Sequence, residues 1–282
     1  MASIVGVHGV GNYRAGHPPE AVAAHLAQTW RAHLSAGPLG LISGKLTVTT
    51  AYYAHYLSKP GKQGAESSIE DLDPLADEML RSWLQQWGVE PGLAQGRGTA
   101  PIRQALSWLA DRQGLAKPAV EKFVVVFFSE VARYLAEQDA PWRVGAASEV
   151  ARVIADAAPP RIVLAHSLGS VVTYEALWAN SDLNVDLLIS LGSPLALPHA
   201  VFPRLQPAPI AYRGCRPPCV NRWFNLADTG DLVAIPQRGI PRFFDGIIPE
   251  DDVEDSIHTF DFHHVANYLS CPRLATVLRE YL

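Results

Sequence analysis

The residue whose surroundings are most typical of a catalytic group is Ser167. It stands between a short apolar run, Arg161–Ala165, and an apolar helical pattern at about 169–179, so the sequence predicts a strand, a tight turn and a helix around it. A nucleophilic serine on such an elbow needs small residues two positions before and two positions after it, and Ala165 and Gly169 occupy those positions. The alternative interpretation is a serine that only caps the following helix.

A second motif, His8-Gly9-Val10-Gly11, directly follows the apolar run Ser3–Val7. A His-Gly turn after a first strand can present a backbone N–H group to a developing oxyanion. We expect the N–H groups of Val10 and Leu168 to form this oxyanion hole, the second of them at a helix N-terminus. The rival interpretation is a dinucleotide-binding Gly-x-Gly-x-x-Gly motif. It is disfavoured because Arg14 occupies the last glycine position.

Candidates for the acid and the base of a serine triad follow later in the chain. Asp228 and Asp231 come directly after the predicted strand Asn221–Ala227, and active sites of open parallel sheets gather at such strand ends. Three histidines lie between that strand and the final predicted helix: His258, His263 and His264. Adjacent side chains point apart, so only one of the last two can contact both the serine and a carboxylate. The alternatives are an aspartate that only shapes a turn and histidines of a solvated loop.

The elements that would position these groups alternate short apolar runs with helical patterns. The runs predict strands at Ser3–Val7, Lys45–Tyr56, Arg161–Ala165, Asp186–Ser190 and Asn221–Ala227. Helical spacing predicts helices at Pro19–Leu34, about 146–157, about 169–179 and Pro272–Leu282. Continuous Val/Ile/Leu runs are typical of parallel strands that are buried on both faces. We therefore expect an α/β fold with a mostly parallel central sheet and helices on both faces.

Residues 57–140 break this alternation. Three helical patterns occur there, at about 69–88, 99–113 and 118–138, and no strand is obvious. An all-helical insertion between parallel strands usually lies over one end of the sheet as a cap. We expect the first two helices to cap the site and the third to return to the core. The chain, 1–282, is predicted to form a single domain that contains this insertion.

Length and composition are those of an ordinary globular protein. The chain has 282 residues, of which 48% are hydrophobic and 18% are charged, and its formal net charge is −5. No Lys/Arg-rich run occurs, so we expect no nucleic-acid partner. The N-terminus lacks the basic region of a signal peptide, and the longest apolar run, Phe123–Phe128, is far shorter than the roughly 20 residues of a spanning helix. We expect a cytoplasmic protein without a transmembrane segment.

Two further features allow more than one interpretation. The run Phe123–Phe128 fits either a core helix, which we prefer, or a membrane-surface contact. There are three cysteines, Cys215, Cys219 and Cys271. The first two could bind a metal or close a small disulfide, but the remaining ligands and the expected cysteine density are missing, so we expect reduced thiols. No metal or organic cofactor is expected, and the sequence predicts no particular oligomeric state.

Taken in order, the motifs resemble those of the α/β-hydrolase superfamily, in its lipase/esterase-like branch of bacterial serine hydrolases. The resemblance omits most of the 57–140 insertion. It rests on five segments: His8-Gly9-Val10-Gly11-Asn12, 165–169, Leu191-Gly192-Ser193-Pro194, Gly230-Asp231-Leu232-Val233 and 263–269. Members often place the triad acid in a Gly/Asn-Asp-x-Val turn, which implies Asp231. Similar members carry the base five residues before a Tyr-Leu pair, which implies His263.

This resemblance implies a serine hydrolase that cleaves carboxylic esters, lipid esters among them, through Ser167, His263 and Asp231. The substrate would be a small-molecule or lipid-like acyl compound. Because the fold hosts other chemistry, two alternatives stay open. One is an acyltransferase or thioesterase with the same triad, and the other is a non-catalytic hydrolase-like binding protein. His264 and Asp228 remain the alternative base and acid.

Overall fold

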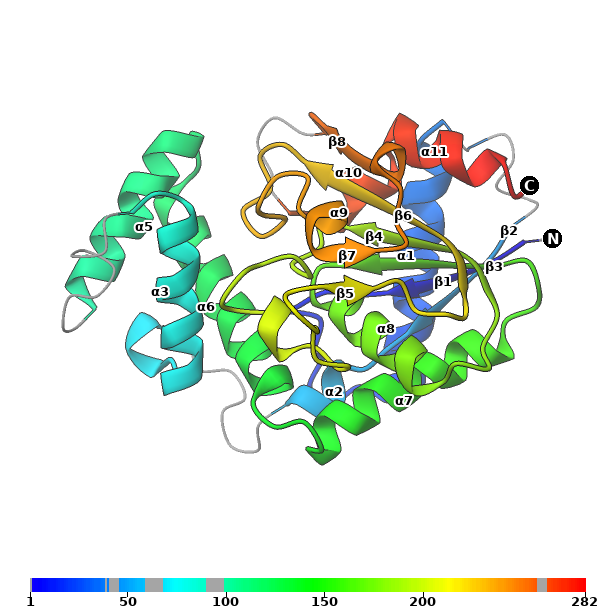
Figure 1. Cartoon of the computed structure of the whole chain (residues 1–282), viewed down its shortest axis with the longest axis horizontal. Helices are drawn as coiled ribbons and strands as arrows, with labels where there is room; N and C mark the ends of the chain where they lie inside the picture. The colour runs from blue at the N-terminus through cyan, green and yellow to red at the C-terminus, as the bar shows by residue number, and fades with distance from the viewer. Residues whose placement is uncertain (1, 39, 41–45, 59–67, 90–98, 258–262) are drawn as a thin grey trace.

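The main strands form one parallel sheet at the centre of the molecule. The structure, a computed structural model, describes residues 2–38, 40, 46–58, 68–89, 99–257 and 263–282. Six strands pair in the order β2-β1-β3-β4-β6-β8, and every neighbouring pair is parallel (Figure 1). Their bounds are β1 (Ala2–Val7), β2 (Leu46–Ala51), β3 (Arg161–His166), β4 (Val185–Leu191), β6 (Val220–Asp228) and β8 (Asp252–Asp255). This sheet confirms the predicted α/β class.

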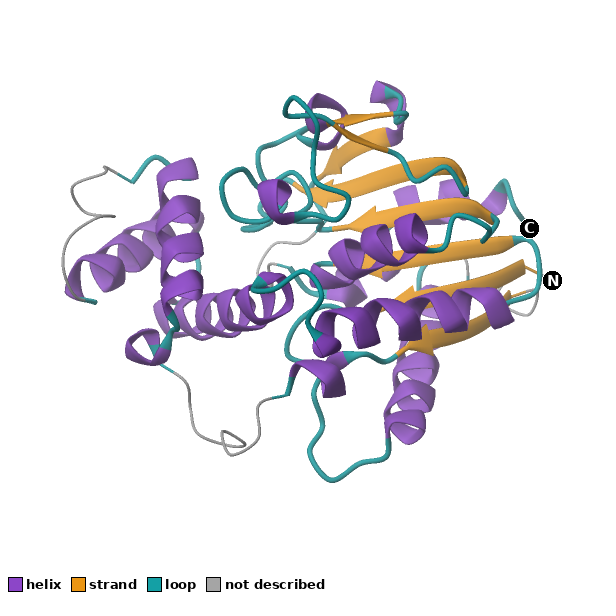
Figure 2. Ribbon diagram, turned by 60° about the horizontal axis from the view of Figure 1, so that its bottom comes forward, coloured by secondary structure: helices purple, strands orange, loops and turns teal. Residues whose placement is uncertain are grey.

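Apolar side chains alternate between the two faces of the sheet. In β3, Val163 belongs to one buried apolar cluster and Ile162 to another, because successive side chains of a strand point to opposite faces. The first cluster is covered by α7 (Pro141–Asp156) and α8 (Leu168–Ala179). The second is covered by α1 (Pro19–Ala36), α10 (Val265–Leu269) and α11 (Pro272–Arg279). Helices therefore lie on both faces (Figure 2).

The edge strand β2 is shorter than the sequence predicted. The expected strand was Lys45–Tyr56, whose first residue lies outside the described residues, but β2 ends at Ala51 and a short helix, α2 (Ala54–Leu57), follows. Tyr53 leaves the strand because it binds the turn after β1. Its N–H donates to His8 Nε2 at 3.3 Å, and its hydroxyl donates to the His8 carbonyl at 2.8 Å.

The opposite edge strand, β8, was not predicted. Its sequence is Asp252-Val253-Glu254-Asp255, and it pairs with β6 alone. Edge strands tolerate charged side chains because one of their two edges has no neighbouring strand. The hydrophobic pattern therefore carried no signal for this strand.

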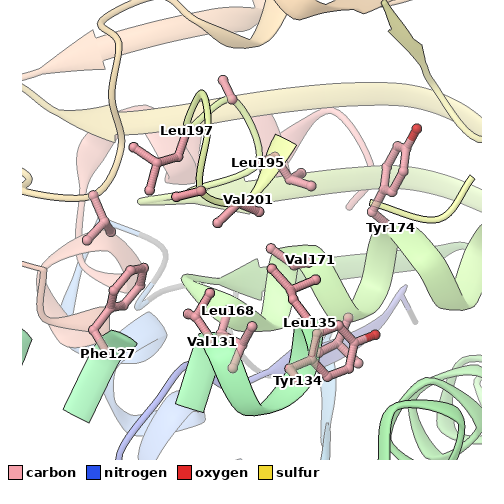
Figure 3. Close-up of a cluster of buried hydrophobic side chains, with 14 of the residues drawn as sticks. Phe127, Val131, Tyr134, Leu135, Leu168, Val171, Tyr174, Leu195, Leu197 and Val201 are labelled. Atoms are coloured by element: carbon pink, nitrogen blue, oxygen red, sulfur yellow. The ribbon is translucent and has the colours of Figure 1, made fainter. Parts of the chain in front are cut away.

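The described helices of the insertion form a lobe beyond the ends of the strands (Figure 1). The α-helices are α3 (Pro74–Gln86), α5 (Ala100–Gln113) and α6 (Lys117–Leu135), and a 3-10 turn at Ile69–Asp71 precedes the first of them. The first begins later than predicted because Asp73 caps it, its carboxylate accepting the Ala76 N–H at 2.9 Å. Helix α6 packs against α3 and α5. Its last turns reach the core, where Val131 and Leu135 share a buried cluster with Leu168 (Figure 3).

A buried ionic cluster joins α6, α7 and α8. Glu175 of α8 accepts the Nε–H of Arg143 at 2.9 Å and the hydroxyl of Tyr134 at 2.7 Å. The Gln206 N–H donates to the other oxygen of the same carboxylate at 3.0 Å. The side chains of Arg143 and Glu175 are only 3% and 5% exposed, so this ion pair is withdrawn from water. It fixes the end of α6 to the helices that cover the sheet.

The remaining elements are short. Two small strands, β5 (Gly214–Cys215) and β7 (Phe244–Asp245), pair in parallel, and α9 (Ile240–Phe243) precedes the second of them. All three cysteines carry free thiols. No helix in the described part of the chain is both long enough and apolar enough to cross a membrane.

Candidate active site

Ser167 occupies a strained turn between β3 and α8. Its backbone φ of 55° and ψ of −131° lie outside the regions that a residue with a side chain prefers, which is typical of residues held for a function. Its N–H donates to the Leu191 carbonyl at 3.0 Å. A Cβ atom at Gly169 would stand 2.4 Å from the His8 carbonyl oxygen, so only glycine lets α8 approach the end of β1. The serine hydroxyl makes no capping bond to α8, against the capping alternative.

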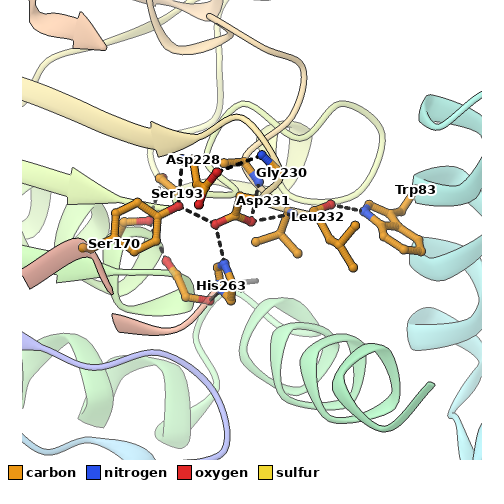
Figure 4. Close-up of polar contacts among 12 residues, drawn as sticks. Trp83, Ser170, Ser193, Asp228, Gly230, Asp231, Leu232 and His263 are labelled. Carbon is orange, nitrogen blue, oxygen red and sulfur yellow. Dashed lines mark hydrogen bonds and ion pairs between the residues drawn. The ribbon is translucent and has the colours of Figure 1, made fainter. Parts of the chain in front are cut away.

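The Ser167 hydroxyl instead begins a chain of hydrogen bonds. Its Oγ lies 2.7 Å from His263 Nε2. On the other side of the ring, His263 Nδ1 lies 2.7 Å from Asp231 Oδ2, and Figure 4 shows this second contact. All three residues are buried. Ser167 follows β3 and Asp231 follows β6. His263 lies two residues before the start of α10. The structure thus brings together the three residues that the sequence selected as a triad.

Asp231 is held as an ionised acceptor. Its Oδ1 accepts the N–H groups of Val233 at 2.9 Å and Ala234 at 3.3 Å, and its Oδ2 accepts the Tyr268 hydroxyl at 2.6 Å. Burial favours the neutral acid, but the adjacent His263 and these hydrogen bonds outweigh it and hold the pKa of Asp231 below its usual value. The carboxylate can therefore orient the imidazole and stabilise its protonated form.

The two alternative residues have other positions. Asp228 Oδ1 accepts the Gly230 N–H at 2.9 Å, so this aspartate shapes the turn that carries Asp231 (Figure 4). His264 is exposed and stands at the N-terminal end of α10. His258, the third histidine of the sequence prediction, lies outside the described residues.

The turn after β1 lies directly against Ser167. A Cβ atom at Gly9 would stand 2.6 Å from Ser167 Cβ, so this position requires glycine. Asn12 Nδ2 donates to the carbonyls of Gly9 and Val10 at 3.0 and 3.1 Å, which fixes the turn. His8 also holds it, because its Nδ1 bonds the Gly9 carbonyl at 2.8 Å while its Nε2 accepts from Tyr53. Burial lowers the pKa of His8 to about 4, so this histidine is neutral.

Both residues expected to supply the oxyanion donors lie near Ser167. Val10 lines the same cavity as the Ser167 side chain. Leu168 is the first residue of α8, where the N–H groups have no partner within the helix. A backbone N–H without an acceptor next to a reactive hydroxyl can receive the charge that develops on a carbonyl oxygen.

An apolar cavity of about 350 Å³ opens onto Ser167 and His263. Helix α6 supplies one wall through Ala119, Lys122, Phe123 and Val126, and Val10 lines another side. The Phe123 ring packs edge-on against His263, with 5.2 Å between ring centroids. We call this space the apolar cavity.

The run Phe123–Phe128 thus has two roles, only one of which the sequence predicted. Val124, Val125, Phe127 and Phe128 are buried in the core, in agreement with the core interpretation. Phe123 and Val126 are three residues apart on the helix, so they share a face, and that face lines the apolar cavity. The helical spacing was the only available signal for this role.

Two contacts, one made by Asp231 and one by its neighbour Leu232, were also missed. Tyr268 was noted only as part of a motif, yet its hydroxyl donates to Asp231, and it also accepts the Asp228 N–H at 3.0 Å. Trp83 of α3 donates its Nε1–H to the Leu232 carbonyl at 2.7 Å, next to the acid (Figure 4). These contacts join residues far apart in the sequence, so no local pattern announces them.

Within the described residues, no group of three or more His, Cys, Asp or Glu side chains is arranged to hold a metal ion. Comparisons with protein-family models, with curated proteins and with solved structures found no match. The function is therefore inferred from the geometry of the site.

Proposed function

We propose that the protein is a serine hydrolase of the α/β-hydrolase type that cleaves carboxylic esters. One observation carries the proposal: hydrogen bonds of 2.7 Å join Ser167 Oγ to His263 Nε2 and His263 Nδ1 to Asp231 Oδ2 without a break. Serine, a titratable base and an ionised acid in this order are the parts that acyl transfer to a hydroxyl requires. The strained elbow adds support, because such backbone strain gathers at functional sites.

The reaction follows from these contacts. His263 Nε2 takes the hydroxyl proton as Ser167 Oγ attacks the ester carbonyl carbon, and the carbonyl oxygen gains the negative charge. The N–H groups of Val10 and Leu168 receive that oxygen, and one such donor typically contributes about 3–4 kcal/mol to the transition state. The tetrahedral intermediate collapses, its bond to the alcohol breaks, and His263 returns the proton to the leaving alcohol.

Water completes the cycle. It attacks the acyl-enzyme while His263 accepts its proton, and the same two N–H groups hold the second oxyanion. The bond to Ser167 Oγ then breaks, the serine regains a proton from His263, and the carboxylic acid leaves. The apolar cavity supports an apolar acyl group, because Val10 and the α6 residues Ala119, Phe123 and Val126 line it beside Ser167, with Lys122 of the same helix as its charged lining residue.

Hydrolysis of p-nitrophenyl esters of increasing acyl length tests the proposal. We expect measurable turnover by the wild type and loss of it in His263→Ala, whereas His264→Ala, at the exposed neighbouring position, keeps most of it. Equal losses in both variants would contradict the assignment of the base. An absence of turnover in the wild type over the whole ester series would contradict ester hydrolysis.

A further inference from the structure

A second cavity lies on the other side of the oxyanion turn. Its volume is about 370 Å³, and it shares Val10, Gly11, His166 and His263 with the apolar cavity. Both cavities therefore meet at the catalytic base. An ester bound at Ser167 has two parts, an acyl group and an alcohol, and two cavities at one base offer a separate place for each.

This second cavity is lined by more histidines than the apolar cavity, whose polar lining residues include Lys122, His166 and His263. Among its described lining residues are one arginine and six histidines: Arg14, His8, His25, His33, His166, His263 and His264. None of its described lining residues is an aspartate or a glutamate. The chain as a whole carries a formal net charge of −5, so this cavity is an exception to the overall charge balance. We call it the histidine cavity.

In two of these histidines, both ring nitrogens already form hydrogen bonds within the protein. His8 bonds the Gly9 carbonyl and the Tyr53 N–H, and both nitrogens of His263 belong to the triad. Arg14 is fixed at the mouth, where its Nη1 donates to the carbonyls of Gly11 and Tyr13 at 3.2 and 3.1 Å. These bonds use one end of the guanidinium group, which carries five donors in all.

His166 supplies a second and independent indication of a ligand. His166 is buried, and its Nε2 has no hydrogen-bond partner within the described part of the chain. The ring lies between the two cavities and packs against His263, with 4.7 Å between centroids. Burial and the neighbouring His263 hold the pKa of His166 well below its ordinary value, so the ring is neutral. A buried polar atom without a partner is costly, and a bound hydroxyl would satisfy it.

We infer that the histidine cavity binds the alcohol part of the ester, and that this alcohol carries an anionic group that Arg14 receives at the mouth. The inference rests on the proposed function and deepens it. The anionic group sits beside Arg14 and the exposed His25, while a polar atom of the alcohol contacts His166 Nε2 in the interior. The preferred substrate is thus an ester between an apolar acid and an anionic alcohol.

Two aryl esters with the same acyl group test this inference. One is 4-carboxyphenyl butyrate, which is anionic, and the other is its neutral methyl ester at the carboxyl group. After correction for their rates of alkaline hydrolysis, we expect kcat/KM of the wild type to favour the anionic ester by about tenfold, the effect of one charge-assisted hydrogen bond at a partly exposed site. The preference should fall as ionic strength rises.

Variants locate the preference. Arg14→Gln should bring the corrected ratio close to one, and Arg14→Lys should restore part of it. Arg31→Gln removes one positive charge from the exposed part of α1 without touching either cavity, so it should keep the wild-type ratio. A wild-type ratio at or below one, or a high ratio that survives Arg14→Gln, would overturn the inference.

Labelling with a fluorophosphonate separates this outcome from failure of the proposed function. A wild type that is labelled but shows no anionic preference leaves the serine hydrolase proposal intact and rejects the anionic subsite. A wild type that is neither labelled nor active on either ester rejects both.

Discussion

Two buried carboxylates of this protein have closely similar surroundings and different consequences. Glu175 accepts a tyrosine hydroxyl, a basic side chain and a backbone N–H, from Tyr134, Arg143 and Gln206. Asp231 has the same three kinds of partner in Tyr268, His263 and Val233.

The two carboxylates differ in the basic residue that each contacts and in the surroundings of that basic residue. An arginine does not release its proton in proteins, and the Arg143–Glu175 pair is sealed between three helices. A histidine can gain and lose a proton near neutral pH, and His263 opens onto two cavities and a serine hydroxyl. Under the proposed function, the same set of hydrogen bonds serves proton transfer at Asp231, whereas at Glu175 it serves stability. Mutations in the two clusters should separate activity from stability.

We call Ser167, His263 and Asp231 the catalytic cluster. The largest effect on kcat is expected from a change at Asp231, its proposed acid. Asp231→Asn should lower kcat about 10⁴-fold, because an amide neither selects the reactive histidine tautomer nor stabilises the imidazolium. The free energy of unfolding should change much less, since the amide oxygen can still accept the Val233 N–H. Ester hydrolysis and urea denaturation of the variant measure the two effects. Asp228→Asn is the matched control, and a loss of kcat as large as that of Asp231→Asn would reject our choice of acid.

The opposite pattern is expected at the ionic cluster. Glu175→Gln leaves the Arg143 charge buried without a counter-ion, and such a change typically costs about 3–5 kcal/mol of unfolding free energy. The kcat of the folded fraction should stay within about threefold of the wild type, because the cluster does not touch the triad. Urea denaturation and active-site-normalised kinetics test both statements. Glu149→Gln, in an exposed pair with Arg152, should cost less than about 1 kcal/mol. Similar losses of unfolding free energy in both variants would show that burial of the Arg143–Glu175 pair does not increase its contribution to stability.

Acid should weaken the catalytic cluster in a predictable direction. The pKa of Asp231 is lower in the folded protein than its ordinary value of 3.8, so its ionisation stabilises the fold above that value. This contribution is lost as pH falls through the folded pKa. Between pH 5 and 3 the free energy of unfolding should therefore fall more steeply for the wild type than for Asp231→Asn. Parallel curves for the two proteins would contradict the lowered pKa.

A smaller effect is expected at the contact between the helical lobe and the acid. Trp83→Phe removes the donor to the Leu232 carbonyl, which costs roughly 1–2 kcal/mol of unfolding free energy. The loss is limited because Trp87 Nε1 also donates to this carbonyl, at 3.3 Å. We expect kcat to fall by about two- to fivefold as the acid loses part of its support. Trp108→Phe, at a half-exposed tryptophan of α5, should leave both quantities unchanged. An unchanged kcat in Trp83→Phe would show that the lobe does not position the acid.

Local patterns predicted the parts of the site that local geometry controls. The Ser167 elbow and the turn around Asp231 each depend on a few consecutive residues, so the sequence carries them directly. The choice between His263 and His264 is different. It depends on a backbone φ of 61° at His263 and on the approach of a distant strand end, and neither follows from hydrophobic spacing. Only the resemblance to hydrolases favoured His263, the neighbour that contacts Ser167 and Asp231 in the structure.

The sequence predicted the strands that are apolar and buried. It missed a strand and a strand end whose positions depend on tertiary contacts. The acidic strand β8 has no hydrophobic pattern, and the end of β2 is set by the bonds of Tyr53 to His8. The cavities could not be predicted either, because each gathers side chains from several elements.

Covalent labelling tests the central claim, the nucleophilic character of Ser167, most directly. The wild type and Ser167→Ala are treated with a fluorophosphonate, and the intact mass and peptide map of each protein are measured. We predict one adduct per chain in the wild type, located on Ser167, and no adduct in the variant. An unlabelled wild type, or equal labelling of both proteins, would contradict the claim.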